Sequence, residues 1–235
     1  MGNSIKAVYV LALSLVLACL QVCAQSELDS LVNQLEETDA DEQKINLLLQ
    51  ITKVGTEAED MVEYANQARE LSKKINDRSL EAKSLLQVGR WNTHLENFDS
   101  ARSAISTAIE LFKFLDDVKY QAKSTSYLAY LNEKMHQYDS ANYYYKKAIA
   151  KALTIEDSSG YALYNLHLGD MENIRGNNHE ALQYIRAANE YFDRPLRKDS
   201  AWISLNSLAI VYDEMGLYPE ALGYYLKAFE IIQEL

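Results

Sequence analysis

Pairs of alanines recur at a fixed distance along the chain, and this repetition constrains the fold more than any other feature. Within a pair the alanines are seven residues apart, close to two turns of an α-helix, so both lie on one helix face. The four pairs are Ala101 and Ala108, Ala141 and Ala148, Ala181 and Ala188, and Ala221 and Ala228. Their first members, at 101, 141, 181 and 221, are 40 residues apart. A repeat of roughly 20 to 50 residues indicates a solenoid of stacked units.

Each unit is expected to contain two helices, the second of which carries the alanine pair. The small side chains let a neighbouring helix approach closely. A fifth, earlier copy has Met61 in place of the first alanine and Ala68 as the second. Asp99 is expected to cap a second helix, whereas Gly176 and Gly216 are expected where a helix ends and the chain reverses. Only eight Gly and two Pro occur in 235 residues, which favours long helices.

Both helices of the unit carry residues typical of a known family. In the first helices these are Val88 and Gly89, Leu168 and Gly169, and Leu208 and Ala209 with Tyr212. In the second helices they are Ala101, Ile105 and Ala108; Ala141, Tyr145 and Ala148; Ala181, Ile185 and Ala188; and Ala221, Tyr225 and Ala228. Over residues 42–235 this pattern resembles the tetratricopeptide repeat (TPR). It departs from the family in having 40 residues per unit instead of about 34 and no closing proline.

The resemblance implies an all-α fold, a right-handed α-solenoid of antiparallel helix pairs with about five repeats. The repeats are expected at about residues 42–81, 82–121, 122–161, 162–201 and 202–235, after an N-terminal helix and acidic connector at 25–41. Twelve small residues are expected at repeat-packing positions: Gly89, Ala101, Ala108, Ala129, Ala141, Ala148, Gly169, Ala181, Ala188, Ala209, Ala221 and Ala228. The array also resembles the exported TPR arrays of bacterial signalling and adaptor proteins.

Residues 1–24 are interpreted as a signal peptide. Lys6 supplies a positive start, an apolar run follows, and Val22 and Ala24 are the small residues of a cleavage site after Ala24. A retained membrane anchor is an alternative, but the run of about 16 residues is short against the roughly 20 that span a bilayer. Lipoprotein processing at Cys19 is a second alternative, because the preceding "VLA" loosely resembles a lipobox. The protein is therefore expected to be exported to the periplasm or cell envelope of a bacterium.

Composition argues against several classes of function. The net charge of −11 argues against nucleic-acid binding through a basic surface. Both cysteines, Cys19 and Cys23, lie in the signal peptide, so a mature chain would lack disulfides, thiol catalysis and thiolate metal sites. The four histidines form no metal-binding pair at helical spacing, and no glycine-rich phosphate loop is present. We therefore expect no enzyme activity, no metal and no cofactor.

The partner-binding surface is expected along the first helices, because repeat solenoids of this kind bind partners on a concave face. By register with the family, the candidates are Lys83, Leu86 and Arg90; Ser126, Tyr130 and Glu133; Leu166, Asp170 and Asn173; and Asn206, Ile210 and Asp213. The early repeats offer basic groups and the later ones acidic groups, so a peptide of opposite polarity would be oriented. The alternative is that these residues form ordinary solvated helix faces.

Three functions remain open at this point. The first is a non-catalytic protein- or peptide-binding module, either free-standing or the sensor portion of a membrane signalling protein such as a histidine kinase or transcriptional regulator that continues past Leu235. The second is a scaffold that self-associates through its last repeat, since no polar capping helix follows Phe229 and Ile232. The third, an enzyme, has no motif in its favour. Membrane contact is expected only through the signal peptide, a lipid anchor or a segment after Leu235.

Overall fold

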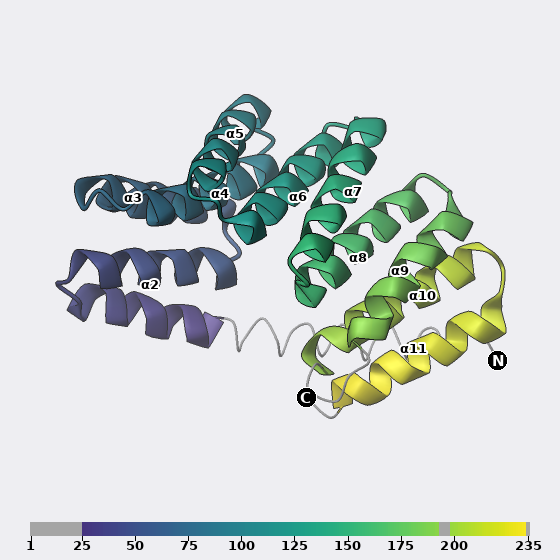
Figure 1. The fold of residues 1–235 in the computed structure, drawn as a ribbon. Coiled ribbons are helices and arrows are strands. Elements are labelled where there is room, and N and C mark those ends of the chain that lie inside the picture. The colour runs from purple at the N-terminus through teal and green to yellow at the C-terminus, as the bar shows by residue number, and fades with distance from the viewer. Residues whose placement is uncertain (1–24, 193–197, 234–235) are drawn as a thin grey trace. The chain divides into compact units, whose positions relative to one another are not determined.

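The computed structural model describes residues 25–192 and 198–233, and these residues are helical apart from short turns (Figure 1). No strand occurs in these two ranges. A helical segment at 25–37 comes first. It is followed by α2 (Asp41–Val54), α3 (Ala58–Lys74), α4 (Arg78–His94), α5 (Phe98–Phe114), α6 (Val118–Lys134), α7 (Tyr138–Thr154), α8 (Ser158–Ile174), α9 (Asn178–Phe192), α10 (Lys198–Glu214) and α11 (Tyr218–Gln233). The predicted all-α solenoid of successive helix pairs is confirmed.

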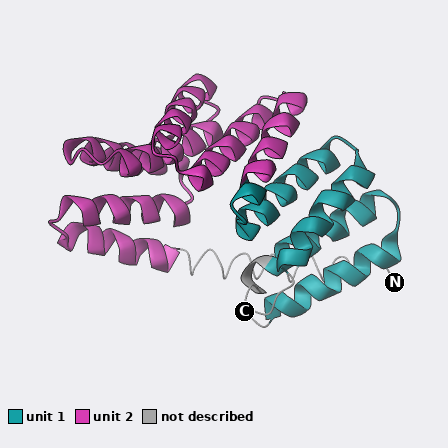
Figure 2. Cartoon of the chain, viewed as in Figure 1, with its two compact units in different colours: residues 1–20, 152–235 teal, residues 21–151 magenta. Residues whose placement is uncertain are grey.

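The chain divides into two compact units, which Figure 2 shows in different colours. Of the described residues, unit 2 comprises 25–151, and unit 1 comprises 152–192 and 198–233. In unit 2 the helices from α2 to α6 pack in chain order, and the first helices of successive pairs also touch, α2 on α4 and α4 on α6. In unit 1 the helices from α8 to α11 pack in chain order, and α8 touches α10. Contacts between a helix and the next helix but one thus involve the first helices of the pairs.

From the end of α3 onward, the described turns between successive helices share one geometry. From α4 onward the helices begin at residues 78, 98, 118, 138, 158, 178, 198 and 218, so the backbone repeats every 20 residues. The middle residue of these turns is left-handed: Asn76 (φ 57°), Glu96 (59°), Asp116 (51°), His136 (57°), Glu156 (53°), Gly176 (79°) and Gly216 (76°). The next amide closes the turn, as in the 3.0 Å bond from Asp117 N to Phe112 O. The chain reversals predicted at Gly176 and Gly216 are confirmed.

Aspartates cap three of the first helices. Asp77, Asp117 and Asp157 are the N-caps of α4, α6 and α8, and each carboxylate accepts a hydrogen bond from the backbone amide three residues ahead. Such a cap stabilises a helix by about 1 kcal/mol. The prediction that Asp99 caps a second helix is wrong, because α5 begins at Phe98 and its N-cap is Asn97. Asp99 lies instead in the first turn, where its negative charge interacts favourably with the positive end of the helix dipole.

The twelve small residues expected at repeat-packing positions are all buried. Two glycines show why a small residue stands there. A Cβ atom on Gly89 of α4 would lie 2.4 Å from Cγ1 of Ile105 of α5, and one on Gly169 of α8 would lie 2.5 Å from Cγ1 of Ile185 of α9. Both distances are far below van der Waals contact, so these glycines allow the two helices of a pair to touch.

A buried hydrogen bond links two first helices of unit 2. The indole N–H of Trp91 on α4 donates to the Thr52 carbonyl at the end of α2 over 2.9 Å. The Trp91 ring packs in the same cluster as Ile51 and Met61. A buried indole N–H needs such an acceptor, so this bond fixes α4 against α2.

The signal peptide predicted at 1–24, with its two cysteines, lies outside the described residues. Among the helices that the structure does describe, none has the length and apolar character needed to cross a bilayer.

Candidate partner-binding face

The predicted binding residues are divided between the two units. Six lie on α4 and α6 of unit 2, and six lie on α8 and α10 of unit 1. Leu86, Ser126 and Leu166 are only 1%, 4% and 5% exposed, so they belong to the interior. Side chains on one face of a helix recur at i, i+4 and i+7, so the column that begins at Lys83 continues at Gln87 and not at Leu86.

The same column recurs 40 residues later, and the two columns form one surface of unit 2. We call this surface the basic face. Its residues are Lys83, Arg90 and His94 on α4 and Lys123, Tyr127, Tyr130 and Lys134 on α6, whereas Gln87, in the same column of α4, is only 5% exposed and lies beneath them. The sequence prediction included Lys83, Arg90 and Tyr130 but missed the other four. The signal for them was the 40-residue period, which carries position 83 to 123 and position 94 to 134.

Aromatic rings lie between the cations of the basic face. The Lys83 ammonium lies 5.2 Å from the centroid of the Tyr120 ring, which reaches it from α6. The rings of His94 and Tyr130 have centroids 5.5 Å apart, and the Lys134 ammonium lies 5.2 Å from the Tyr130 ring. Cation–ring contacts at exposed sites stabilise by about 0.5–1 kcal/mol each. They therefore hold the long side chains in place before any partner arrives.

Within residues 25–192 and 198–233, the cations of the basic face form no ion pair with a carboxylate. Among the described residues, no ion pair joins an acidic group to Lys83, Arg90, Lys123, Lys134 or the nearby Lys53 of α2. The chain has 34 acidic and 23 basic residues, so this local excess runs against the overall charge. Burial, and then the positive charges of Lys53, Arg90 and Lys119, lower the pKa of Lys123. Lys123 therefore lies in a positive potential that an anionic partner would relieve.

The basic face also offers neutral hydrogen-bonding groups. Burial raises the pKa of Tyr127 and of Tyr130, so both hydroxyls keep their protons at neutral pH. Partial burial, followed by the charges of Arg90 and Lys134, lowers the pKa of His94, so its imidazole is neutral at pH 7. The side-chain oxygen of Gln87 is buried and has no hydrogen-bond partner in the described part of the chain. Neutral hydroxyl and imidazole groups thus accompany the charges, above one buried acceptor that has no partner in the described residues.

Glu133, another predicted binding residue, ties two helices together. The Tyr145 hydroxyl of α7 donates to Glu133 Oε2 over 2.9 Å, and Tyr145 is 1% exposed. Burial raises the pKa of Glu133, against the opposing effects of this hydrogen bond and of the Lys134 charge. No group of three or more His, Cys, Asp or Glu side chains within residues 25–192 and 198–233 is placed to hold a metal ion.

The first helices of unit 1 present a different surface at equivalent positions. Leu163 and Ile174 of α8 are 42% and 65% exposed, and Ile203 and Ile210 of α10 are 40% and 37% exposed. Four other predicted residues of this unit are partly buried: Asp170, Asn173, Asn206 and Asp213. Exposed aliphatic side chains therefore accompany the acidic groups predicted for the later repeats. Among these four aliphatic residues, only Ile210 was predicted from the sequence.

Comparison with known proteins agrees with the repeat architecture. Residues 203–235 match the family model described as tetratricopeptide repeat. No curated protein matches the sequence. A similar solved structure is BtubC from P. vanneervenii, at 13% identity and a TM-score of 0.66 over 92% of this chain and 90% of that one. Another is a Rap protein complexed with Competence and Sporulation Factor, at 15% identity and a TM-score of 0.63 over 91% of this chain and 71% of that one.

A third similar structure contains the TPR-like repeats of a kinesin light chain from Podosopora anserina. It has 16% identity and a TM-score of 0.60 over 81% of this chain and 93% of that one. At these identities the likeness concerns the fold alone. The last helix pair thus matches the tetratricopeptide-repeat family model, and the fold as a whole is similar to that of solved TPR-like repeat proteins.

Proposed function

We propose that this protein is a non-catalytic binding module that holds an acidic peptide segment of a partner protein on the basic face of unit 2. The observation that carries the proposal is a set of cations on α2, α4 and α6 that form no ion pair with any described carboxylate, in a chain of net charge −11. The Rap protein of similar fold was solved in complex with Competence and Sporulation Factor, so a solenoid of this kind can hold a separate ligand.

The chemistry of the basic face favours acidic side chains interleaved with apolar or aromatic ones. Ammonium and guanidinium groups would pair with carboxylates, and their mutual repulsion in the free protein would fall when they do. The ring faces of Tyr127 and Tyr130 offer flat, partly apolar contact, and their hydroxyls can donate to peptide carbonyls.

Selection from a random peptide library would test the proposal. We expect peptides selected on the purified wild-type protein to be enriched in Asp and Glu, and their affinity to fall as salt is raised, because the pairs are partly exposed. The double variant Arg90→Glu, Lys123→Glu should bind a selected peptide at least about 100-fold more weakly, since each reversal exchanges attraction for repulsion worth roughly 1.4 kcal/mol or more. Fluorescence anisotropy with the labelled peptide measures both effects.

The variant Lys146→Glu serves as the control for charge. Lys146 lies on α7 of the same unit, is exposed, and is not part of the basic face. It should leave the affinity within about twofold of wild type, because one distant surface charge is largely screened. Selected peptides without an acidic excess, or equal weakening by the Lys146 variant and the double variant, would contradict binding at this face.

We further propose that the protein acts in the bacterial cell envelope, on the strength of the apolar segment within residues 1–24. The intact mass and the cell fraction of the native gene product test this. A periplasmic species with the mass of the chain without residues 1–24 is the expected result. A larger membrane-bound species would favour the sensor portion of a signalling protein instead, and a species confined to the cytosol would refute export. Mass measured at several concentrations tests the scaffold alternative.

A further inference from the structure

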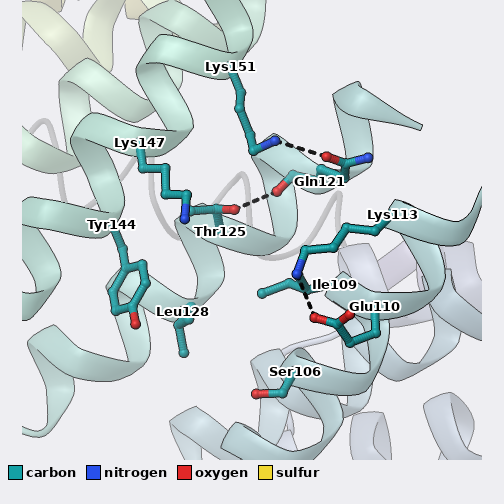
Figure 3. A pocket seen from close by; sticks show the side chains of 10 residues that line it. All are labelled: Ser106, Ile109, Glu110, Lys113, Gln121, Thr125, Leu128, Tyr144, Lys147 and Lys151. Atoms are coloured by element: carbon teal, nitrogen blue, oxygen red, sulfur yellow. Dashed lines mark hydrogen bonds and ion pairs between the residues drawn. The ribbon is translucent and has the colours of Figure 1, made fainter. Parts of the chain in front are cut away.

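A pocket of about 240 Å³ lies on the opposite side of α6 from the basic face, between α5 and α7 of unit 2 (Figure 3). α6 contributes Gln121, Thr125 and Leu128 to it. At 100° per residue these positions are on the far side of the helix from Lys123 and Tyr127. The pocket is therefore a second, separate feature of unit 2.

Three lysines and one carboxylate line this pocket. Lys113 and Glu110 of α5 form an ion pair of 2.6 Å. Lys147 and Lys151, one turn apart on α7, extend towards α6 (Figure 3). Within the described residues Lys147 forms no ion pair and lies 5.8 Å from the ring of Tyr143. Three positive charges against one negative charge leave the pocket with a net charge of +2.

One of these lysines is held in place by a chain of hydrogen bonds. The Lys151 ammonium donates to Gln121 Oε1 over 2.9 Å, and Gln121 Nε2 donates to the Phe112 carbonyl near the end of α5 over 3.1 Å. Thr125 Oγ1 donates to the Gln121 carbonyl over 2.7 Å. α5, α6 and α7 thus fix the position of Lys151, so the cationic part of the pocket is preorganised for a ligand.

Apart from Ser106, the rest of the lining is apolar or aromatic. Ile109 of α5, Leu128 of α6 and the ring of Tyr144 of α7 are all partly buried. They form a wall that could receive an organic group of modest size, whereas a bare inorganic anion would leave this wall uncovered. Polar and apolar linings side by side call for a ligand that has both parts.

We propose that this pocket binds a phosphate monoester whose organic part is apolar or aromatic. Phosphate carries about −1.5 to −2 charges at pH 7, which matches the net charge of the pocket. Lysine suits phosphate as a point charge, and Lys147 and Lys151 would contact its oxygens. The organic part would lie on Ile109, Leu128 and Tyr144. This chemistry can come from a small phosphorylated compound or from a phosphorylated aromatic side chain of a protein. The proposal does not depend on the peptide-binding function, because it concerns the other side of α6.

Phenyl phosphate is the probe, titrated into the full-length protein and followed by 15N NMR. We expect chemical-shift changes in the Thr125 backbone amide and in the Gln121 side-chain amide. Phenyl phosphate should bind more tightly than inorganic phosphate, which lacks the aromatic ring, and more tightly than phenylacetate, which lacks the phosphate. Lys147→Gln should weaken phenyl phosphate roughly fivefold, as expected for the loss of one exposed ion pair. Lys147→Arg should retain most of the affinity, because it keeps the charge.

Lys146→Gln is the matched control, since Lys146 is the exposed neighbour of Lys147 and does not line the pocket. It should bind phenyl phosphate as the wild type does. A phosphotyrosine peptide that binds more tightly than phenyl phosphate would identify a protein as the source, and an equal or weaker affinity would identify a small compound. The proposal is overturned if phenyl phosphate causes no chemical-shift changes at millimolar concentration. It is also overturned if Lys146→Gln weakens the binding of phenyl phosphate as much as Lys147→Gln does.

Discussion

Ala141→Leu is expected to lower the free energy of unfolding by about 1–3 kcal/mol, because it adds three carbons to a site with no space for them. Ala141 is 0% exposed on α7. One turn later on the same helix, Tyr145 is also buried and donates its hydrogen bond to Glu133 of α6. A larger side chain at 141 has to displace α7 from its contacts or adopt a strained rotamer. Urea denaturation followed by circular dichroism measures the change.

The control for this substitution is available on the same helix. Ala150 of α7 is exposed, so Ala150→Leu makes the same chemical change without entering the interior. Its effect should stay within about 0.5 kcal/mol, as for most surface substitutions. If the two variants were equally stable, the alanine spacing would not report the packed face of the helix, and the repeat register based on it would fail.

Gly169→Ala is expected to destabilise the protein by about 1–3 kcal/mol even though alanine is the better helix former. The new Cβ would lie 2.5 Å from Cγ1 of Ile185, 3.1 Å from the Ala181 carbonyl oxygen and 3.2 Å from the Ile185 backbone nitrogen. Two of these three atoms belong to the backbone of α9, so a rotamer change alone cannot relieve the clash. The same urea experiment gives the free energy of unfolding.

Gly223→Ala, in the same unit, is expected to change the free energy of unfolding in the opposite direction. Gly223 is an exposed residue of α11, and a Cβ atom there would meet no atom within 4 Å. Intrinsic helix preference should then act alone and raise stability by about 0.5–1 kcal/mol. The two substitutions are chemically identical, so a difference in sign isolates the packing effect. A gain in both variants would mean that α8 and α9 can move apart without cost.

Much of the fold could be predicted from the sequence, because alanine spacing reports the face on which two helices touch. The turns could not be predicted as fully. Gly176 and Gly216 mark two of them, but Glu96, His136 and Glu156 take the same left-handed conformation with no glycine to signal it. These residues are held there by the hydrogen bonds that end each helix, and such bonds depend on helix length, which a sequence pattern defines only within a few residues.

The basic face was only partly predictable, for two physical reasons. An error of one position rotates a helical side chain by about 100°, which is why Leu86 was predicted where Gln87 belongs. No described carboxylate pairs with Lys123, and this depends on which carboxylates come within reach in three dimensions, whereas the sequence of an acidic chain suggests the contrary. The 20-residue backbone period, in contrast, is implicit in the 40-residue repeat, because both helices of a unit have nearly equal lengths.

The left-handed residues between helices have a consequence for how stable this architecture can become. An L-residue with a side chain pays about 1–2 kcal/mol in that conformation, less for Asn and Asp, whereas glycine does not. Five of the seven described turns that have a left-handed residue carry such a side chain, and it recurs at the same point of successive units. The strain is therefore multiplied along the array, and it lies in exposed connections far from the packed alanines. The free energy of unfolding is therefore lower than the packed interior alone would give. Substitutions confined to the turns between helices could recover the difference.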